Sequence, residues 1–428
     1  MKTWVTSLRT KWWMAAANRS RSRHPKALRF LQKVIAAEPH NALALVKVGH
    51  CLTALGRCDE AIEFFERALQ LSPSYSEAHA YLAVAYRQLG RNQEALESLN
   101  RAFRIKPKLK SQVFWLFQLG SVCGRLGLWN ESLEAFRGEA KLKPKDASAW
   151  EGIGWACSYL NRDAEAVAAY LRALEFNPNR ESLHSDLGRA YLRLKQFEKA
   201  AQSLRTFLKV RPNDLEGLHN LVVAVSATGN SAEVVNLFLK ATKLEPANAN
   251  LRFNLGLAYD TLDNHENAAA SFKEATRLDP NDADSYSRLA VSYALLEKRS
   301  EAIEAAREGV RLAPSSALAY LCLGIALCGP DSYSDAANAY QKSLELDPDQ
   351  FGALANLGEV YSLVGRVEEA IQALEQSAKI KPNDAKVHFL LAECYLKAGN
   401  REGASRHYEI VKGLDRALSE DLAKILAK

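Results

Sequence analysis

The chain has 428 residues, of which 48% are hydrophobic and 25% are charged, and its formal net charge is +6. It contains no uninterrupted run of 18 apolar residues, so we expect no membrane span. The excess charge is local, because residues 1–37 contain nine Lys or Arg and no acid, which leaves −3 for the rest. A near-neutral remainder is not typical of a nucleic-acid-binding protein, so we expect no specific nucleic-acid partner.

The first segment, residues 1–41, is basic and contains three tryptophans before residue 14. Three interpretations of residues 1–24 remain open: a degenerate first pair of helices, a basic amphipathic segment in peripheral contact with an anionic membrane surface, or an organellar transit peptide. We expect a cytoplasmic protein, with a peripheral-membrane or organellar location as the alternative. Residues 26–39 are predicted to form the second helix of a degenerate first repeat, because Ala27, Leu31 and Val34 share the register of later repeats.

Residues 42–416 are divided by prolines at a near-constant interval. Nine of the ten intervals are 34 residues long and the other is 37. A fixed period of this size indicates one supersecondary unit that is repeated along the chain. The prolines are Pro39, Pro73, Pro107, Pro144, Pro178, Pro212, Pro246, Pro280, Pro314, Pro348 and Pro382.

Each interval predicts two amphipathic helices, because apolar residues recur at steps of three and four in two runs of about a dozen residues. The fourth repeat shows the pattern clearly, with Trp150, Gly154, Ala166, Tyr170 and Pro178. Small residues such as Gly154 are expected where two helices cross closely. Glycine recurs at the turn between the helices, where a helix C-cap needs a positive φ.

This pattern resembles the tetratricopeptide repeat over residues 42–416, as eleven repeats. The resemblance implies an all-α fold, an α-solenoid of about eleven 34-residue helix–turn–helix units wound into a right-handed superhelix. Residues 417–428 are predicted to form a C-terminal capping helix, with Leu418, Leu422 and Leu426 on its apolar side. Solenoids of this kind present long concave surfaces to partners, so the predicted function is protein or peptide binding.

The family frame places the first helix of every repeat along the concave groove. Several groove positions are apolar: Phe114 and Phe117 in the third repeat, Trp155 and Tyr159 in the fourth, and Phe253 in the seventh. An exposed apolar groove usually marks a binding site, so these residues are candidates for peptide anchors. The alternative is that neighbouring helices or the N-terminal segment bury them.

A second set of groove candidates is polar. Asn220, Asn254 and Asn356 occupy one position in the sixth, seventh and tenth repeats, and Arg288 occupies it in the eighth. A carboxamide carries both a donor and an acceptor and can hold a peptide backbone. The arrangement resembles the asparagine ladder of the O-GlcNAc transferase repeat domain, which here implies capture of an extended peptide and no sugar transfer. The alternative is that these are ordinary solvated helix residues.

The loops between repeats predict a charge gradient along one edge. Early loops are basic and later loops are acidic, which suggests steering of a charged partner or head-to-tail self-association. The alternative is a solvated surface. The basic residues are Arg104, Lys106, Lys108, Lys110, Lys141, Lys143 and Lys145, and the acidic residues are Asp279, Asp282, Asp284, Glu345, Asp347 and Asp349.

The sequence contains none of the phosphate-binding, metalloprotease or nucleophile-elbow motifs. Its seven cysteines include no Cys-x-x-Cys pair, which is typical of free thiols in a reducing compartment. We therefore expect no catalytic residues, cofactor or metal, and predict a scaffold or adaptor that binds protein segments to assemble a complex. The alternatives are a membrane-surface adaptor held by residues 1–24, and a non-catalytic regulatory subunit of a separate enzyme.

Overall fold

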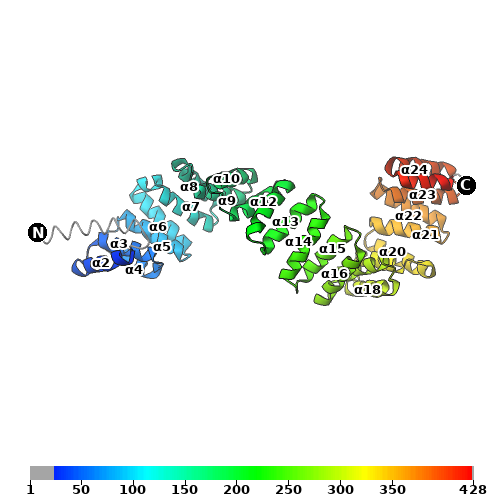
Figure 1. The fold of residues 1–428 in the computed structure, drawn as a ribbon, viewed down its shortest axis with the longest axis horizontal. Helices are drawn as coiled ribbons and strands as arrows, with labels where there is room; N and C mark the ends of the chain where they lie inside the picture. The colour runs from blue at the N-terminus through cyan, green and yellow to red at the C-terminus, as the bar shows by residue number, and fades with distance from the viewer. Residues whose placement is uncertain (1–23, 427–428) are drawn as a thin grey trace. The chain divides into compact units, whose positions relative to one another are not determined.

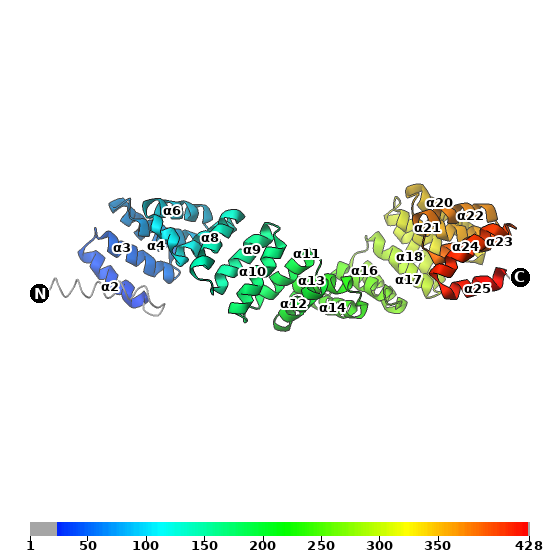
Figure 2. The same ribbon diagram turned by 90° about the horizontal axis from the view of Figure 1, so that it is seen from above.

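The computed structural model describes residues 24–426, and every regular element in that range is helical. The chain divides between Ala224 and Val225 into two compact units, called here the N-terminal module and the C-terminal module. Antiparallel helix pairs follow one another along each module (Figures 1 and 2). The predicted all-α repeat fold is confirmed, whereas the interpretations of residues 1–23 concern a segment outside the described residues.

The N-terminal module holds the pairs from α2 to α12, and the division falls within α13. Its helices are α2 (His24–Ala37), α3 (Ala42–Ala54), α4 (Cys58–Leu71), α5 (Ser76–Gln88), α6 (Asn92–Ile105), the 3-10 helix η2 (Pro107–Ser111), α7 (Val113–Arg125), α8 (Trp129–Leu142), α9 (Ala147–Tyr159), α10 (Asp163–Phe176), α11 (Ser182–Arg193), α12 (Phe197–Val210) and α13 (Leu215–Ala227).

The C-terminal module continues the same alternation. Its helices are α14 (Ser231–Leu244), α15 (Ala249–Asp260), α16 (His265–Leu278), α17 (Ala283–Leu295), α18 (Arg299–Leu312), α19 (Ala317–Leu327), the 3-10 helix η3 (Pro330–Ser332), α20 (Tyr333–Leu346), α21 (Phe351–Leu363), α22 (Val367–Ile380), α23 (Ala385–Lys397), α24 (Arg401–Leu414) and α25 (Arg416–Leu426). None of the helices within residues 24–426 is long and apolar enough to cross a membrane.

The two helices of a repeat approach closely at a glycine of the first helix. A Cβ atom on Gly154 would lie 2.5 Å from Cε1 of Tyr170, and one on Gly256 would lie 2.5 Å from Cε1 of Phe272. Both aromatic rings are almost fully buried. Because interiors are packed to crystal-like density, the ring of the second helix occupies the space that any side chain at the glycine would need.

The turn between the two helices needs a left-handed residue, and ten repeats place one at the same position. Six of the turns use glycine, as predicted, with φ between 73° and 82°. Four use residues that the sequence pattern did not single out, namely Asn161, Lys195, Asp263 and Glu297, with φ between 51° and 59°. At these four residues the left-handed backbone conformation has a steric cost that glycine avoids.

Ring nitrogens hold the loops between repeats. Nε1 of Trp150 donates a hydrogen bond to the carbonyl oxygen of Pro144 at 2.7 Å. Nε2 of His79 and of His388 lie 3.0 and 2.9 Å from the carbonyl oxygens of Pro73 and Pro382, six residues earlier in each case. The ring therefore satisfies a loop carbonyl that helix geometry leaves unpaired.

The described chain ends on a helix that covers the last pair. Leu418, Leu422 and Leu426 of α25 pack with Ala392 of α23 and Val411 of α24. At the other end, α2 packs on α3 and contributes Ala27, Leu28 and Leu31 to the core of the N-terminal module. Both terminal helices thereby bury apolar faces that would otherwise meet water.

Candidate functional site

The first helices α7, α9 and α11 of three successive repeats line a hollow of about 380 Å³ in the N-terminal module. Phe117 of α7 and Trp155 of α9 both line it, so the structure brings together two predicted residues from different repeats. Aromatic rings from the second helices, Phe136 and Tyr170, form its base. The hollow is therefore apolar at the bottom and open to solvent.

A glycine and a helix N-cap explain why the hollow can form. A Cβ atom on Gly152 would lie 2.6 Å from the ring of Phe136, so the α9 backbone itself forms part of the wall. The start of α9 is fixed by Asp146, whose side chain accepts a hydrogen bond from the Ser148 backbone N–H at 3.0 Å. This N-cap sets the register of Gly152 and Trp155 on the helix.

Large aromatic side chains remain exposed on the same helices. Phe114 is 50% exposed, Trp155 is 36% exposed and Tyr159 is 55% exposed. Water contact at three such rings is unfavourable, and exposed apolar patches on proteins usually mark interaction sites.

Two of these rings, Trp155 and Tyr159, form a cluster with Trp129 of α8, and we call this cluster the aromatic step. The Trp129 and Tyr159 rings are stacked, with centroids 4.0 Å apart and an angle of 3° between their planes. Trp155 meets both rings edge-on, with centroids 5.6 and 5.8 Å away and interplanar angles of 75° and 78°. Sequence reasoning missed Trp129, which is the first residue of a second helix and therefore was outside the groove positions considered.

The charged side chains around the hollow are paired with one another. Arg180 forms an ion pair with Glu151 and donates to Oγ of Ser148 at 2.9 Å. Arg193 pairs with Asp163 at 2.6 Å. Because acids and bases are matched, the wall offers little net charge to a ligand.

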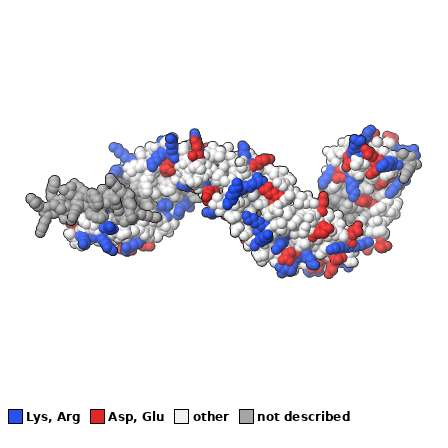
Figure 3. Space-filling view, in the orientation of Figure 1, with Lys and Arg blue, Asp and Glu red and all other residues white. Residues whose placement is uncertain are grey.

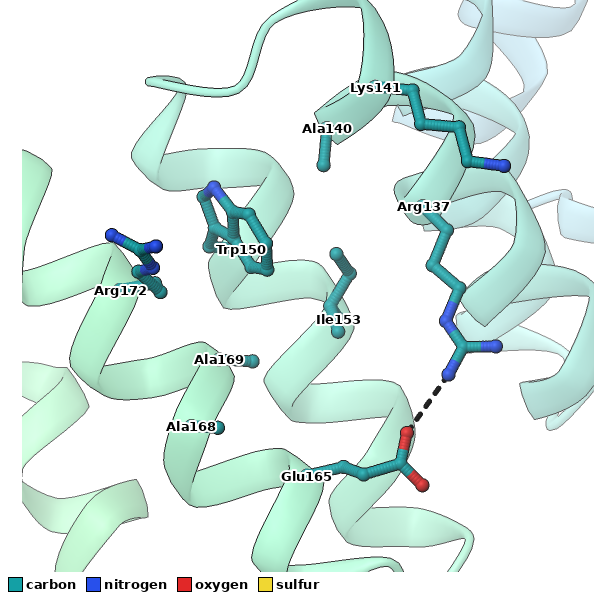
Figure 4. A pocket seen from close by; sticks show the side chains of 9 residues that line it. All are labelled: Arg137, Ala140, Lys141, Trp150, Ile153, Glu165, Ala168, Ala169 and Arg172. Atoms are coloured by element: carbon teal, nitrogen blue, oxygen red, sulfur yellow. Dashed lines mark hydrogen bonds and ion pairs between the residues drawn. The ribbon is translucent and has the colours of Figure 1, made fainter.

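A second hollow of about 500 Å³ lies between the second helices α8 and α10, above α9 (Figure 4). Trp150 and Ile153 of α9 form its floor with small residues of α8 and α10, and Arg137 spans one side through a 2.9 Å ion pair with Glu165. The sequence did not predict this hollow, because the repeat pattern treats Trp150 only as a packing residue.

Glu139 is an unusual buried acid in the same part of the module. Its side chain is 2% exposed, and its Oε2 atom has no hydrogen-bond partner among the described residues. Burial raises the pKa of Glu139 to about 7, the nearby Asp146 raises the pKa further, and Lys143 opposes the shift. The charged form of Glu139 is therefore unfavourable in the folded protein.

Three of the predicted site residues in the remaining repeats are partly buried or hydrogen-bonded within the protein. Phe253 is half-buried, with its ring centroid 5.6 Å from that of Phe272. Asn356 hydrogen-bonds to the buried Tyr340 hydroxyl. The Nδ2 atom of Asn220, in the N-terminal module, is buried without a hydrogen-bond partner within residues 24–426.

Asn254 and Arg288 are partly exposed in the C-terminal module. Burial raises the pKa of the Asp260 carboxyl, and the charges of His265 and Arg288 oppose that shift. Arg288 thus already acts on a carboxylate of the preceding repeat.

Loop charges of both signs have local partners. Lys106 pairs with Glu77 at 2.6 Å. Asp279 and Asp347 accept hydrogen bonds from backbone N–H groups two residues later, at 3.1 and 3.3 Å. Figure 3 shows Lys and Arg interspersed with Asp and Glu on the visible face. An ion pair and turn hydrogen bonds therefore account for several of the loop charges. Self-association through the loops stays a hypothesis.

Three family models match the chain. The one described as "Cilia and flagella-associated protein 70 C-terminal domain" matches residues 26–252. Two models described as "Tetratricopeptide repeat" match residues 331–388 and 363–428, and residues 249–282 and 283–316.

Relatives with known names match short parts of the chain. A peroxisomal targeting signal receptor of Candida glabrata is 28% identical over 89 residues, which is 21% of this chain and 15% of the relative. The BBSome complex member BBS4 of Mus musculus is 27% identical over 121 residues, which is 28% of this chain and 23% of the relative. The chain thus spans less than a quarter of the length of these relatives.

Solved structures share the helical repeat at low identity. The Cut9–Hcn1 hetero-tetramer of the APC/C is 15% identical, with 98% of this chain and 96% of that chain covered and a TM-score of 0.49. Yeast Tom70 is 17% identical, with 98% and 95% covered and a TM-score of 0.45.

Proposed function

The chain belongs to the tetratricopeptide-repeat family, and over residues 26–252 to the family of the cilia and flagella-associated protein 70 C-terminal domain; on that premise we propose that it is a non-catalytic adaptor that captures peptide segments of partner proteins. The capturing surface is formed by the first helices of its repeats. Its role is to bring such partners into one complex.

One observation carries the proposal: Phe117 and Trp155 from successive repeats line one hollow, beside the exposed Phe114 and Tyr159. The hollow has an apolar base, and serine and charged residues share its lining; a concave site that combines apolar surface with polar groups is suited to a peptide. The main binding energy is expected from Trp155 and Tyr159, because aromatic anchors dominate interfaces.

Residues of the later repeats supply a second contact region in this proposal. Phe253 offers an apolar contact, Asn254 and Asn356 offer carboxamides, and Arg288 offers a charge, whereas the Nδ2 atom of Asn220 in the N-terminal module is buried and must be uncovered before it can contact a ligand.

The location proposed for this function is cytoplasmic. All seven cysteines are free and six are buried, as is typical of a reducing compartment. One relative is named as a receptor for a targeting signal and another as a member of a complex, and the matching family is named for cilia and flagella. Peptides from proteins of cilia and flagella are therefore a sensible first set of ligands.

The test is selection of binders from a displayed library of random 12-residue peptides against the full chain, followed by calorimetric titration of the selected peptides. We expect Phe117→Ala and Trp155→Ala each to weaken binding about tenfold, since anchor truncation costs more than 1 kcal/mol. Phe253→Ala tests the second contact region in the same way.

Leu171→Ala is the matched control, because Leu171 is 47% exposed on the second helix α10 and does not line the hollow. Selected peptides that bind the wild type, Phe117→Ala, Trp155→Ala and Leu171→Ala equally would show that the hollow is not the site. Circular dichroism of each variant confirms that helix content is unchanged.

A further inference from the structure

We propose that the aromatic step of Trp129, Trp155 and Tyr159 recognises a proline-rich partner segment in the polyproline II conformation. This inference rests on the proposed function and names the class of peptide that the N-terminal module selects. Three properties of the step carry the inference: its shape, its hydrogen-bonding character and its charge.

The shape is a right-angled corner of ring faces and edges. The stacked Trp129 and Tyr159 rings form one side, and Trp155 stands nearly perpendicular to them at 75° and 78°. Aromatic-lined grooves of this kind bind polyproline II segments, because pyrrolidine rings are flat enough to pack between aromatic faces. The exposed Tyr159 face and the neighbouring hollow beside Phe117 extend the surface along the chain direction of a ligand.

The polar edges of the two indoles face away from Gly124 of α7. A Cβ atom on Gly124 would lie 3.4 Å from Cζ3 of Trp129 and 3.4 Å from Cζ3 of Trp155. Cζ3 belongs to the edge of the indole opposite Nε1, so the benzo edges rest near Gly124 of α7 and the N–H edges point away from that helix. Neither Nε1 atom has an acceptor among residues 24–426, and the Tyr159 hydroxyl has no partner there either.

The step therefore offers two indole N–H groups that can only donate, and its one side-chain acceptor is the Tyr159 hydroxyl, which can also donate. A polyproline II segment is the backbone that matches this: its carbonyls form no internal hydrogen bonds, and proline has no N–H that would need an acceptor. A helix uses its carbonyls internally, and an ordinary extended strand brings one N–H donor per residue, more than the single hydroxyl of the step can accept.

The surrounding charge favours a neutral ligand. Arg180 is paired with Glu151 and Arg193 with Asp163, so a charged peptide would have to compete with existing ion pairs. Proline-rich segments bind without this competition, and their preformed conformation lowers the entropy cost of binding.

The experiment measures fluorescence anisotropy of a fluorescein-labelled decaproline peptide titrated with the full chain. We expect saturable binding that weakens at least fivefold in Trp129→Ala and in Tyr159→Ala. Trp155→Phe keeps a ring and removes the N–H, and we expect it to weaken binding about threefold. Leu171→Ala is the control and should bind as the wild type does.

Two comparison probes test the conformation. A labelled glycine–serine decamer and a labelled alanine–glutamine helical peptide should each bind at least tenfold more weakly than decaproline. Equal binding of the helical peptide, absence of saturable decaproline binding, or decaproline binding that is insensitive to Trp129→Ala and Tyr159→Ala would overturn the inference.

The outcomes separate this inference from the proposed function. Selected library peptides that lack proline but depend on Trp155 would leave the peptide-binding function standing and overturn only the polyproline assignment. Decaproline binding that depends on the aromatic step supports both. Circular dichroism at 222 nm and the melting temperature distinguish loss of binding from loss of fold in each variant.

Discussion

Two tryptophans five residues apart on α9 serve opposite faces of the same helix. Trp150 is half-buried, lies on the floor of the hollow between α8 and α10, and donates its N–H to the Pro144 carbonyl. Trp155 lines the hollow between first helices, is 36% exposed, and has no acceptor among the described residues. At 100° per residue the two side chains leave the helix roughly 140° apart.

The difference lies in how the polar atom of each ring is used. The Trp150 N–H donates to the loop that joins two repeats, so Trp150 contributes to the stability of the fold. Trp155 keeps its donor free on an exposed surface, where a ligand can use it. A half-buried tryptophan is thus assigned to folding or to binding by the partner of its Nε1 atom, and not by its exposure alone.

Gly154→Ala is expected to have the largest effect on stability, because Gly154 lies on α9, the helix that holds both tryptophans. Its new Cβ atom would lie 2.5 Å from the almost fully buried Tyr170 ring, and so severe an overlap is expected to cost about 3 kcal/mol or more, the upper end of the range for overpacking. We expect a lower melting temperature and faster hydrogen exchange in peptides from residues 147–176. Gly124→Ala is the control, since its closest contact would be 3.3 Å, and equal melting temperatures for the two variants would contradict the packing argument.

Glu139→Gln tests the helix α8, which packs against α9. The folded pKa of Glu139 is about 7, above its ordinary value of 4.5, so the folded state binds the proton more tightly between these values. Stability is therefore expected to fall as pH rises from 4.5 to 7, by about 2–3 kcal/mol, and to stay lower above pH 7. Glu139→Gln should remove this loss and protect residues 113–146 from hydrogen exchange at pH 8. A wild-type protection that does not change between pH 5 and 8 would show that Glu139 is not the titrating group.

Trp150→Phe and Trp155→Phe form a matched pair that compares the two N–H groups directly. Trp150→Phe loses the hydrogen bond to Pro144 and is expected to lower stability by about 1 kcal/mol. Trp155→Phe loses no hydrogen bond within the described protein, so its stability is expected to change by less than about 0.5 kcal/mol. Urea titration of each variant measures the difference, and an equal loss in both would mean that the N–H partner does not separate the two roles.

Lys195→Gly is expected to have the smallest effect and affects neither tryptophan. Lys195 has φ of 55°, a conformation that costs a non-glycine residue about 1–2 kcal/mol, part of which glycine loses again in the unfolded chain. The net expectation is a gain of about 0.5 kcal/mol in unfolding free energy with unchanged peptide binding. Replacement of Gly90, whose φ is 78°, by Lys should act in the opposite direction, and a gain there would contradict the strain argument.

The repeated fold could be predicted from the sequence because the residues that determine it lie close together in the chain. Proline spacing, the glycine at the turn and the small residue opposite Tyr170 are each determined within one repeat. The four turns without glycine show the limit, since Asn161 and Lys195 adopt the same conformation only because flanking helices hold them there.

The candidate site was predictable only in part, because it depends on contacts between repeats. Groove positions identified Phe117 and Trp155, which line one hollow. They could not identify Trp129, which joins the cluster from the second helix of the preceding repeat through its stack on Tyr159. The asparagine positions were predicted from their place in the repeat alone. That place does not reveal that Asn356 is hydrogen-bonded to Tyr340.

The geometry of the aromatic step also makes the protein its own spectroscopic reporter. Three aromatic chromophores lie with ring centroids 4.0, 5.6 and 5.8 Å apart at fixed angles. Rings held this closely in an asymmetric arrangement couple their electronic transitions and produce a strong near-ultraviolet circular dichroism signal. A ligand that enters the corner changes the spacing or the polarity around the indoles, so occupancy can be followed on the unlabelled chain at the wavelengths where tryptophan absorbs.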